Sequence, residues 1–281
     1  MRVARRPAVG ALALALLTPS AATAQVSVER LQRKPLEDGV HGSVETNLSL
    51  TSGNVEMFDV GVAASILYQT LQPRHAGDPI GRFADTSSPV PYLRDRVLLL
   101  GNLRYAEAFD ARTAANGFLH ARVVSMWHPL IGSETYAQIQ FNEFQRLQAR
   151  TLVGAGARVD LVHTQSALGW LGSGLMWEYE RLDQPEPEFE RTFRGDVRWS
   201  SYAAARFQLG DNRFLLQPIV YMQPRLDRFD DLRLLLELAG DARVLGDLSA
   251  GLRVSVLHDT APPVGVLQTD LRLVHTLRLE L

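Results

Sequence analysis

The sequence contains no cysteine, and only one lysine, Lys34, among its 29 basic residues. The absence of thiols excludes a disulfide scaffold, a thiol nucleophile and an N-terminus anchored through a lipid-modified cysteine. No segment beyond Ala24 approaches the ~18 consecutive apolar residues of a membrane-spanning helix. The formal net charge is -2, so no basic excess points to nucleic acid as a partner.

Motifs that carry chemistry are also missing from the sequence. There is no phosphate-binding Walker loop, no dinucleotide fingerprint and no HExxH zinc motif. The seven histidines are scattered, and none are spaced as a pair of metal ligands. We therefore expect no catalytic residues, no bound metal and no cofactor. The length of 281 residues still permits a single domain, because β-barrels often exceed 200 residues.

The first residues have the three parts of a secretory signal peptide. Arg2, Arg5 and Arg6 give a basic start, Ala8–Leu17 is apolar, and Ala22-Thr23-Ala24 offers a small-x-small cleavage site. The alternative, an N-terminal anchor, is disfavoured because the apolar run is too short to span a bilayer. We expect a signal peptide over residues 1–24, a polar periplasmic arm over 25–41, and a barrel domain over 42–281.

From Gly42 onward, apolar and polar residues alternate with a period of two, which indicates β-strands. Turn-like connectors separate the alternating segments, and the long proline-bearing connector Leu71–Arg94 is expected to be irregular. About twelve strands result, each near the ~9–11 residues that a tilted transmembrane strand needs. The predicted strands are residues 43–50, Phe58–Tyr68, Arg96–Tyr105, Phe118–Trp127, Tyr136–Phe144, Arg150–Leu161, Ala167–Tyr179, Arg194–Phe207, Phe214–Gln223, Leu232–Ala239, Leu248–Val256 and Asp270–Leu281.

Alternation alone leaves two orientations open, because a soluble β-sandwich or lipocalin-like barrel buries its apolar face instead. The placement of the aromatic residues favours a membrane barrel. Phe58 and Tyr68 share one phase ten residues apart, which for a tilted strand gives ~25 Å, the height between aromatic girdles. The predicted girdle comprises Phe58, Tyr68, Tyr105, Trp127, Trp177, Tyr179, Trp199 and Phe207, with Tyr221 also at the outer rim. We therefore predict an all-β, antiparallel up-and-down transmembrane β-barrel with a polar lumen.

Charged residues of both signs occupy the opposite phase, where they would pair across a hydrated lumen. Four glycines in this phase, Gly154, Gly156, Gly172 and Gly174, would make room for the arginines. The charges would form a selectivity ring for a solute, or they would simply coat a soluble sheet. The candidate lumen residues are Glu45, Asp59, Arg104, Arg122, Arg158, Asp160, Glu178, Glu180, Arg198, Arg206, Arg253, Asp270, Arg272 and Arg278.

Two further segments each allow both a functional and a purely structural interpretation. His258-Asp259 invites comparison with outer-membrane lipases, but Ser255 is an odd number of residues from His258, so their side chains point to different faces. The acidic segment Asp183–Glu190 would bind divalent cations that bridge lipopolysaccharide phosphates, or it is a solvated loop held extended by two prolines.

Several short motifs occur together in a familiar order. Leu48-Ser-Leu-Thr-Ser-Gly-Asn-Val-Glu56 is followed by Phe144-Gln-Arg146 with Arg150-Thr-Leu-Val-Gly-Ala-Gly156, by Glu178-Tyr-Glu180 and Tyr221-Met-Gln-Pro224, and by Asp230-Asp-Leu-Arg233 and His258-Asp-Thr-Ala-Pro-Pro263. Over about residues 40–281 this series resembles domain-of-unknown-function family 481, typified by a salt-induced bacterial outer-membrane protein. The resemblance implies an outer-membrane β-barrel and supplies no catalytic residues.

The leading hypothesis is a bacterial outer-membrane barrel with a structural or permeability role and no catalysis. It would be a small-solute channel or a plugged barrel linked to envelope or salt stress. The expected partners are outer-membrane lipid, lipopolysaccharide and the barrel-assembly machinery. Two alternatives are a lipid-modifying outer-membrane enzyme and a soluble periplasmic β binding protein.

Overall fold

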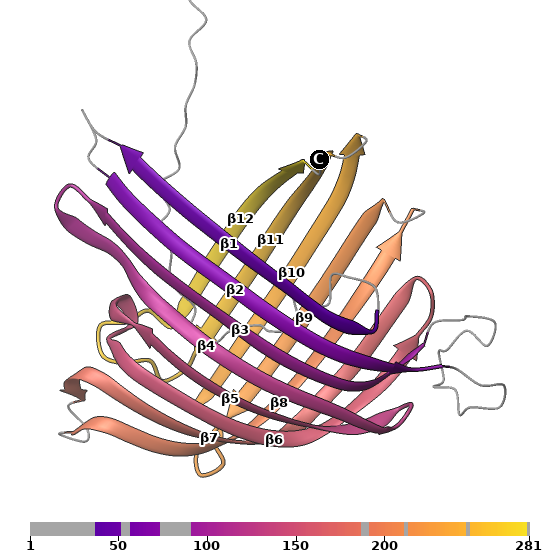
Figure 1. Ribbon diagram of the computed structural model, residues 1–281. Coiled ribbons are helices and arrows are strands. Elements are labelled where there is room, and N and C mark those ends of the chain that lie inside the picture. The colour runs from indigo at the N-terminus through magenta and orange to yellow at the C-terminus, as the bar shows by residue number, and fades with distance from the viewer. Residues whose placement is uncertain are drawn as a thin grey trace, which may run out of the picture.

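In the part of the chain that the structure describes, twelve antiparallel strands follow one another in up-and-down order, which confirms the fold class predicted from the alternation. The computed structural model describes residues 37–51, 57–73, 91–186, 191–210, 213–245 and 248–279 (Figure 1). The strands are β1 (Gly39–Thr51), β2 (Met57–Gln72), β3 (Tyr92–Ala108), β4 (Ala111–His128), β5 (Ile131–Asn142), β6 (Leu147–His163), β7 (Ala167–Glu186), β8 (Arg191–Leu209), β9 (Phe214–Pro224), β10 (Leu232–Leu245), β11 (Leu248–Asp259) and β12 (Thr269–Leu279). The signal peptide and nearly all of the expected N-terminal arm lie outside the described residues.

The sheet curls into a barrel whose walls are seen one behind the other in Figure 1, β1–β4 in front and β9–β12 behind. Interactions between strands far apart in the order support this curvature. Tyr202 on β8 donates a hydrogen bond to Glu134 on β5, 2.7 Å across the interior. The Gln145 amide of the β5–β6 turn lies 3.4 Å from a carboxylate oxygen of Asp270 on β12.

The barrel has two distinct ends. Because the number of strands is even, β1 begins and β12 ends at the same end, which we call the terminal end. The hairpins β3–β4, β5–β6, β7–β8, β9–β10 and β11–β12 turn at the opposite end, the hairpin end. Among the described residues, no helix is long and apolar enough to cross a membrane.

The described strands have 11 to 20 residues, and all except β12 are longer than the sequence alternation predicted. A run of ~9–11 residues is enough for a tilted transmembrane strand, and β7 with 20 residues exceeds that length. The segment Leu71–Arg94 was expected to be an irregular loop, but Leu71 and Gln72 belong to β2 and Tyr92–Arg94 to β3. Tyr92 and Leu93 are buried, which explains why pairing extends through them. Residues 74–90 lie outside the described residues.

The end of β5 also differs from the prediction, which placed Phe144 in a strand. Residues Glu143–Gln145 form a short 3-10 helix. The Asn142 side chain caps this helix by accepting a hydrogen bond from the Phe144 backbone N–H, 3.1 Å away. Arg146 follows in the left-handed region with φ 56°, which reverses the chain into β6. A local side-chain bond therefore ends the strand despite its continuing alternation.

Glycines on the inner face make room for tyrosine rings, not for arginines as the sequence suggested. A Cβ atom on Gly154 would overlap the ring of Tyr136, and one on Gly172 would overlap the ring of Tyr202. Gly156 and Gly174 face each other across β6 and β7, where either Cβ would meet the opposing backbone. Inner tyrosines and inner glycines are thus complementary features of the same walls.

We predict that Gly172→Ala displaces the Tyr202 ring and weakens its hydrogen bond to Glu134. Overpacking of this kind costs about 1–3 kcal/mol. The temperature at which the detergent-extracted barrel changes its gel mobility should fall. Gly195→Ala is the matched control, because the nearest atom to its new Cβ would be 3.9 Å away. Equal effects of the two substitutions would contradict this packing.

Candidate functional site: the barrel interior

Burial separates the two faces of the sheet into a charged interior and an apolar exterior. Arg158, Glu178 and Arg198 are 3%, 1% and 0% exposed, whereas Ile139, Val153 and Leu175 are more than half exposed. Such a distribution is the reverse of that in a water-soluble protein, where charged residues are almost never fully buried unless they are paired. The interior is therefore where functional chemistry is to be sought.

The predicted lumen residues lie mostly on this inner face. Arg122, Arg158, Glu178, Glu180, Arg198 and Arg206 are buried, while Asp59, Arg104, Asp160, Arg253 and Asp270 are half-buried there. Arg272 is exposed, but it pairs in register with the buried, inward Ser255 and so shares its face. The side chains of Glu45 and Arg278 lie outside the described residues.

The predicted girdle residues lie on the outer face in two groups. Phe58, Tyr105, Trp177 and Tyr179 lie toward the hairpin end, and Phe58 and Tyr105 have ring centroids 6.3 Å apart, while Trp199 lies near the middle of β8. Tyr68, Trp127 and Phe207 lie toward the terminal end. Tyr221 was expected in the outer rim and instead points inward, 4% exposed. Both faces of β9 carry apolar residues, so alternation could not orient this strand.

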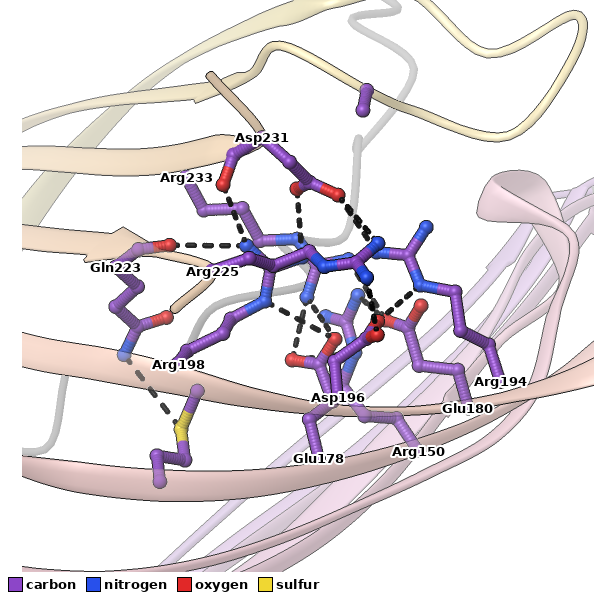
Figure 2. A network of polar contacts seen from close by, with 12 residues as sticks. Arg150, Glu178, Glu180, Arg194, Asp196, Arg198, Gln223, Arg225, Asp231 and Arg233 are labelled. Carbon is purple, nitrogen blue, oxygen red and sulfur yellow. Dashed lines mark hydrogen bonds and ion pairs between the residues drawn. The ribbon is translucent and has the colours of Figure 1, made fainter. Parts of the chain in front are cut away.

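An extensive ion-pair network lies on the inner face of β6 to β10, toward the hairpin end (Figure 2). We call it the inner network. It comprises Arg150, Glu178, Glu180, Arg194, Asp196, Arg198, Gln223, Arg225, Asp231 and Arg233. Six of its members are at most 5% exposed, namely Arg150, Glu178, Glu180, Arg198, Asp231 and Arg233. Ion pairs this deeply buried survive only when every charge has close partners.

Arg233 ties the network together because each of its three nitrogens reaches a carboxylate. Its Nη1 donates to both oxygens of Glu178 at 2.6 Å, and its Nη2 donates to Glu180 at 2.9 Å. Its Nε donates to Asp259 on β11 at 2.8 Å. Arg150 on β6 also pairs with Glu180. One guanidinium thereby links β7, β10 and β11.

Asp231, which precedes β10, is the second centre of the network. Its carboxylate accepts hydrogen bonds from Arg198 at 2.9 Å, from Arg194 at 3.1 Å and from Arg225 at 3.3 Å. Burial alone would raise the pKa of Asp231, but the Arg198 charge and hydrogen bond, with other nearby arginines, hold that pKa below its usual range. The carboxylate therefore stays ionised and keeps three guanidinium groups together.

A second cluster, which we call the crossbar, lies on the terminal-end side of the inner network and joins β4 and β5 to β8 and β9. It comprises Arg122, Glu134, Tyr136, Tyr202 and Tyr221. The guanidinium of Arg122 lies over the rings of Tyr136 and Tyr202, 5.3 and 5.5 Å from their centroids. Tyr202 also stacks on Tyr221 at 5.1 Å and donates to Glu134. The cavity between crossbar and network has a volume of about 30 Å³, room for about two water molecules. A wide solute pathway does not pass through this part of the interior.

Side chains also fill the interior toward the terminal end. Arg158 donates to Asp160 at 2.9 Å and lies 4.8 Å above the Trp170 ring. The Tyr92 and His163 rings, from β3 and β6, stack at 4.6 Å. At the hairpin end, Arg146 of the β5–β6 turn donates to the Val264 carbonyl at 2.5 Å. Because β5–β6 and β11–β12 are half the strand order apart, the β11–β12 loop reaches across that end.

His258, Asp259 and Ser255, on which the lipid-modifying enzyme alternative rests, do not contact one another in a catalytic arrangement: each has a different partner or faces a different side of the sheet. His258 Nδ1 lies 2.9 Å from Thr269 Oγ1, whereas Asp259 accepts from Arg233. Ser255 is buried on the inner face, opposite to His258. In the described ranges, no group of three or more candidate ligands is arranged to hold a metal ion. Asp183 of the acidic segment accepts from Arg146 at 3.0 Å, and the remaining side chains of that segment lie outside the described residues.

Sequence reasoning missed much of the inner network, including Arg150, Arg194, Asp196, Arg225, Asp231 and Arg233. Arg225 and Asp231 flank a turn, where alternation gives no orientation. Arg233 lies in β10, where its phase also holds Leu235 and Ala239, so the inner face of this strand did not look polar. The available signal was the density of charge in Arg225–Arg233, with six charged residues out of nine.

We predict that Arg233→Gln destabilises the barrel by about 3–5 kcal/mol, because it leaves Glu178 and Glu180 buried with fewer counter-charges. Arg104→Gln is the matched control, since the Arg104–Asp59 pair is partly exposed, at 30% and 17%, and pairs in contact with water contribute about 1 kcal/mol or less. Urea unfolding in detergent micelles measures both. Equal losses would contradict a central role for Arg233.

The comparisons with known proteins yielded one match. Neither the curated proteins nor the solved structures contain a match to this chain. A family model with the description "Protein of unknown function, DUF481" matches residues 44–280, which span all twelve strands apart from the first residues of β1. The chain therefore belongs to the DUF481 family, as the order of its short motifs suggested.

Proposed function

We propose that the protein is a bacterial outer-membrane β-barrel with a permeability or structural role and no catalytic activity. The observation that carries this proposal is the inversion of its surface. Large apolar side chains cover the outside, Leu175 among them at 54% exposure, while the fully buried Arg198 lies inside. Monomeric soluble proteins rarely expose contiguous apolar patches of such extent.

A lipid environment accounts for both faces of the sheet. In a bilayer, every backbone polar group must be paired within the protein. The eleven antiparallel pairs from β1 to β12 meet this need inside the sheet, and closure of β12 onto β1 would meet it at the two edges. The outward aromatic residues form two groups at different depths, as expected at the two membrane interfaces. The signal peptide expected over residues 1–24 would deliver the chain to the compartment from which such barrels are inserted.

The interior favours a narrow barrel over a general diffusion pore. The inner network and the crossbar bind β4 to β10 together and leave a cavity of only about 30 Å³ between them. In this proposal, the network fills part of the interior with paired charges, in space that water would otherwise occupy. Outer-membrane lipid, lipopolysaccharide and the assembly machinery are the partners that the proposal requires.

The proposal predicts that the protein fractionates with the outer membrane, resists extraction by salt, and migrates faster on gels before boiling than after. A closed sheet keeps its compact form in detergent until heated, whereas a soluble binding protein would appear in the periplasmic fraction without detergent. Recovery in that fraction would contradict the proposal. An unchanged rate of lipid turnover in His258→Ala would dispose of the enzyme alternative.

A further inference from the structure

The inner face of the barrel is filled unevenly around its circumference. On β4 to β9 the inner side chains are mostly buried, and they are large: arginines, glutamates, glutamines and tyrosines. On β11, β12, β1, β2 and the hairpin half of β3 they are mostly half-buried or exposed. We call these five strands the open wall. Water has room next to the open wall that it lacks elsewhere in the interior.

Small inner side chains account for the space next to the open wall. Inner positions of the open wall hold small residues, among them Ser43 on β1, Ala63 and Ser65 on β2, and Ser249 and Gly251 on β11. The Ser43 and Ser65 hydroxyl oxygens lie 2.7 Å apart. Ser43 is exposed and Ser65 is half-buried, so this polar inner surface is accessible to water.

Among the described residues of the open wall, the guanidinium groups are more exposed than the carboxylates. Arg104 is 30% exposed and its partner Asp59 only 17%, while Arg253 is 21% exposed and its partner Glu237 only 3%. Arg272 is exposed on the same face, and Asp270 is half-buried. In both of these pairs, a larger fraction of the arginine side chain than of its carboxylate partner is exposed. Arginines that line a pore favour anions.

We propose that a narrow water-filled path runs along the open wall and prefers small anionic solutes over cations. The inference rests on the proposed function and gives it a location and a solute class. The inner network would then stabilise the wall opposite the path and not obstruct it. Arg104, Arg253 and Arg272 would be the residues that set the preference.

The absence of native cysteine allows a direct test by single substitutions. Ser65→Cys places a thiol on the open wall, Ala204→Cys places one on the filled wall, where Ala204 is 5% exposed, and Ala64→Cys places one on the outer face beside Ser65. The protein is reconstituted in phosphatidylcholine liposomes. It is then treated with a membrane-impermeant methanethiosulfonate reagent that carries a negatively charged sulfonate group. We expect Ser65→Cys to react at least tenfold faster than the other two variants.

The three variants separate the inference from the proposed function. If Ser65→Cys is as unreactive as Ala204→Cys while Ala64→Cys is also protected, the barrel is in lipid but has no path along the open wall. If Ala64→Cys reacts as fast as Ser65→Cys, the outer face is in water and the membrane proposal itself fails. Each result is read by mass spectrometry of the labelled chain.

The solute preference is tested by the reversal potential in planar bilayers under a potassium chloride gradient. We expect a chloride-to-potassium permeability ratio above one, which Arg272→Glu lowers. Arg181→Glu is the matched control, because Arg181 is exposed on the outer face of β7. A native ratio at or below one, or equal effects of the two substitutions, would overturn the anion preference.

Discussion

The structure depends on the mutual neutralisation of arginines and carboxylates in the barrel interior. A buried charge without a partner costs several kcal/mol, so a large group of buried ions is stable only as a complete set. Arg233 meets this constraint by contacting Glu178, Glu180 and Asp259, and Asp231 meets it by accepting from three arginines. Arginine suits this role better than lysine, because its planar fork of donors serves several acceptors at once. This fits a chain with 28 arginines and one lysine.

The glycines and tyrosines of the interior determine how the space inside the barrel is filled. A sheet of twelve strands encloses more space than eight strands do, whose side chains just fill the interior. Tyr136 and Tyr202 extend into that space over Gly154 and Gly172, and Arg122 lies against both rings. The filled part of the interior therefore combines ion pairs with aromatic packing.

The sequence predicted the number, order and phase of the strands because a period of two is a local property. Inner positions such as Arg158 and outer positions such as Trp177 follow directly from that phase. Tyr221 was placed on the wrong face because β9 is apolar on both faces. The partners of Arg233 were beyond prediction, because Glu178 is 55 residues away and their contact depends on the curvature of the whole sheet. The capping of β5 by Asn142 likewise overrode a continuing alternation.

The most direct test of the inverted orientation uses the four tryptophans. Variants that keep only Trp199, 41% exposed on the outer face, or only Trp170, 4% exposed inside, are placed in liposomes with brominated acyl chains. Bromine quenches fluorescence on contact, so the account predicts strong quenching of Trp199 and little of Trp170. Strong quenching of Trp170, or quenching of Trp199 by aqueous iodide in place of bromine, would contradict it.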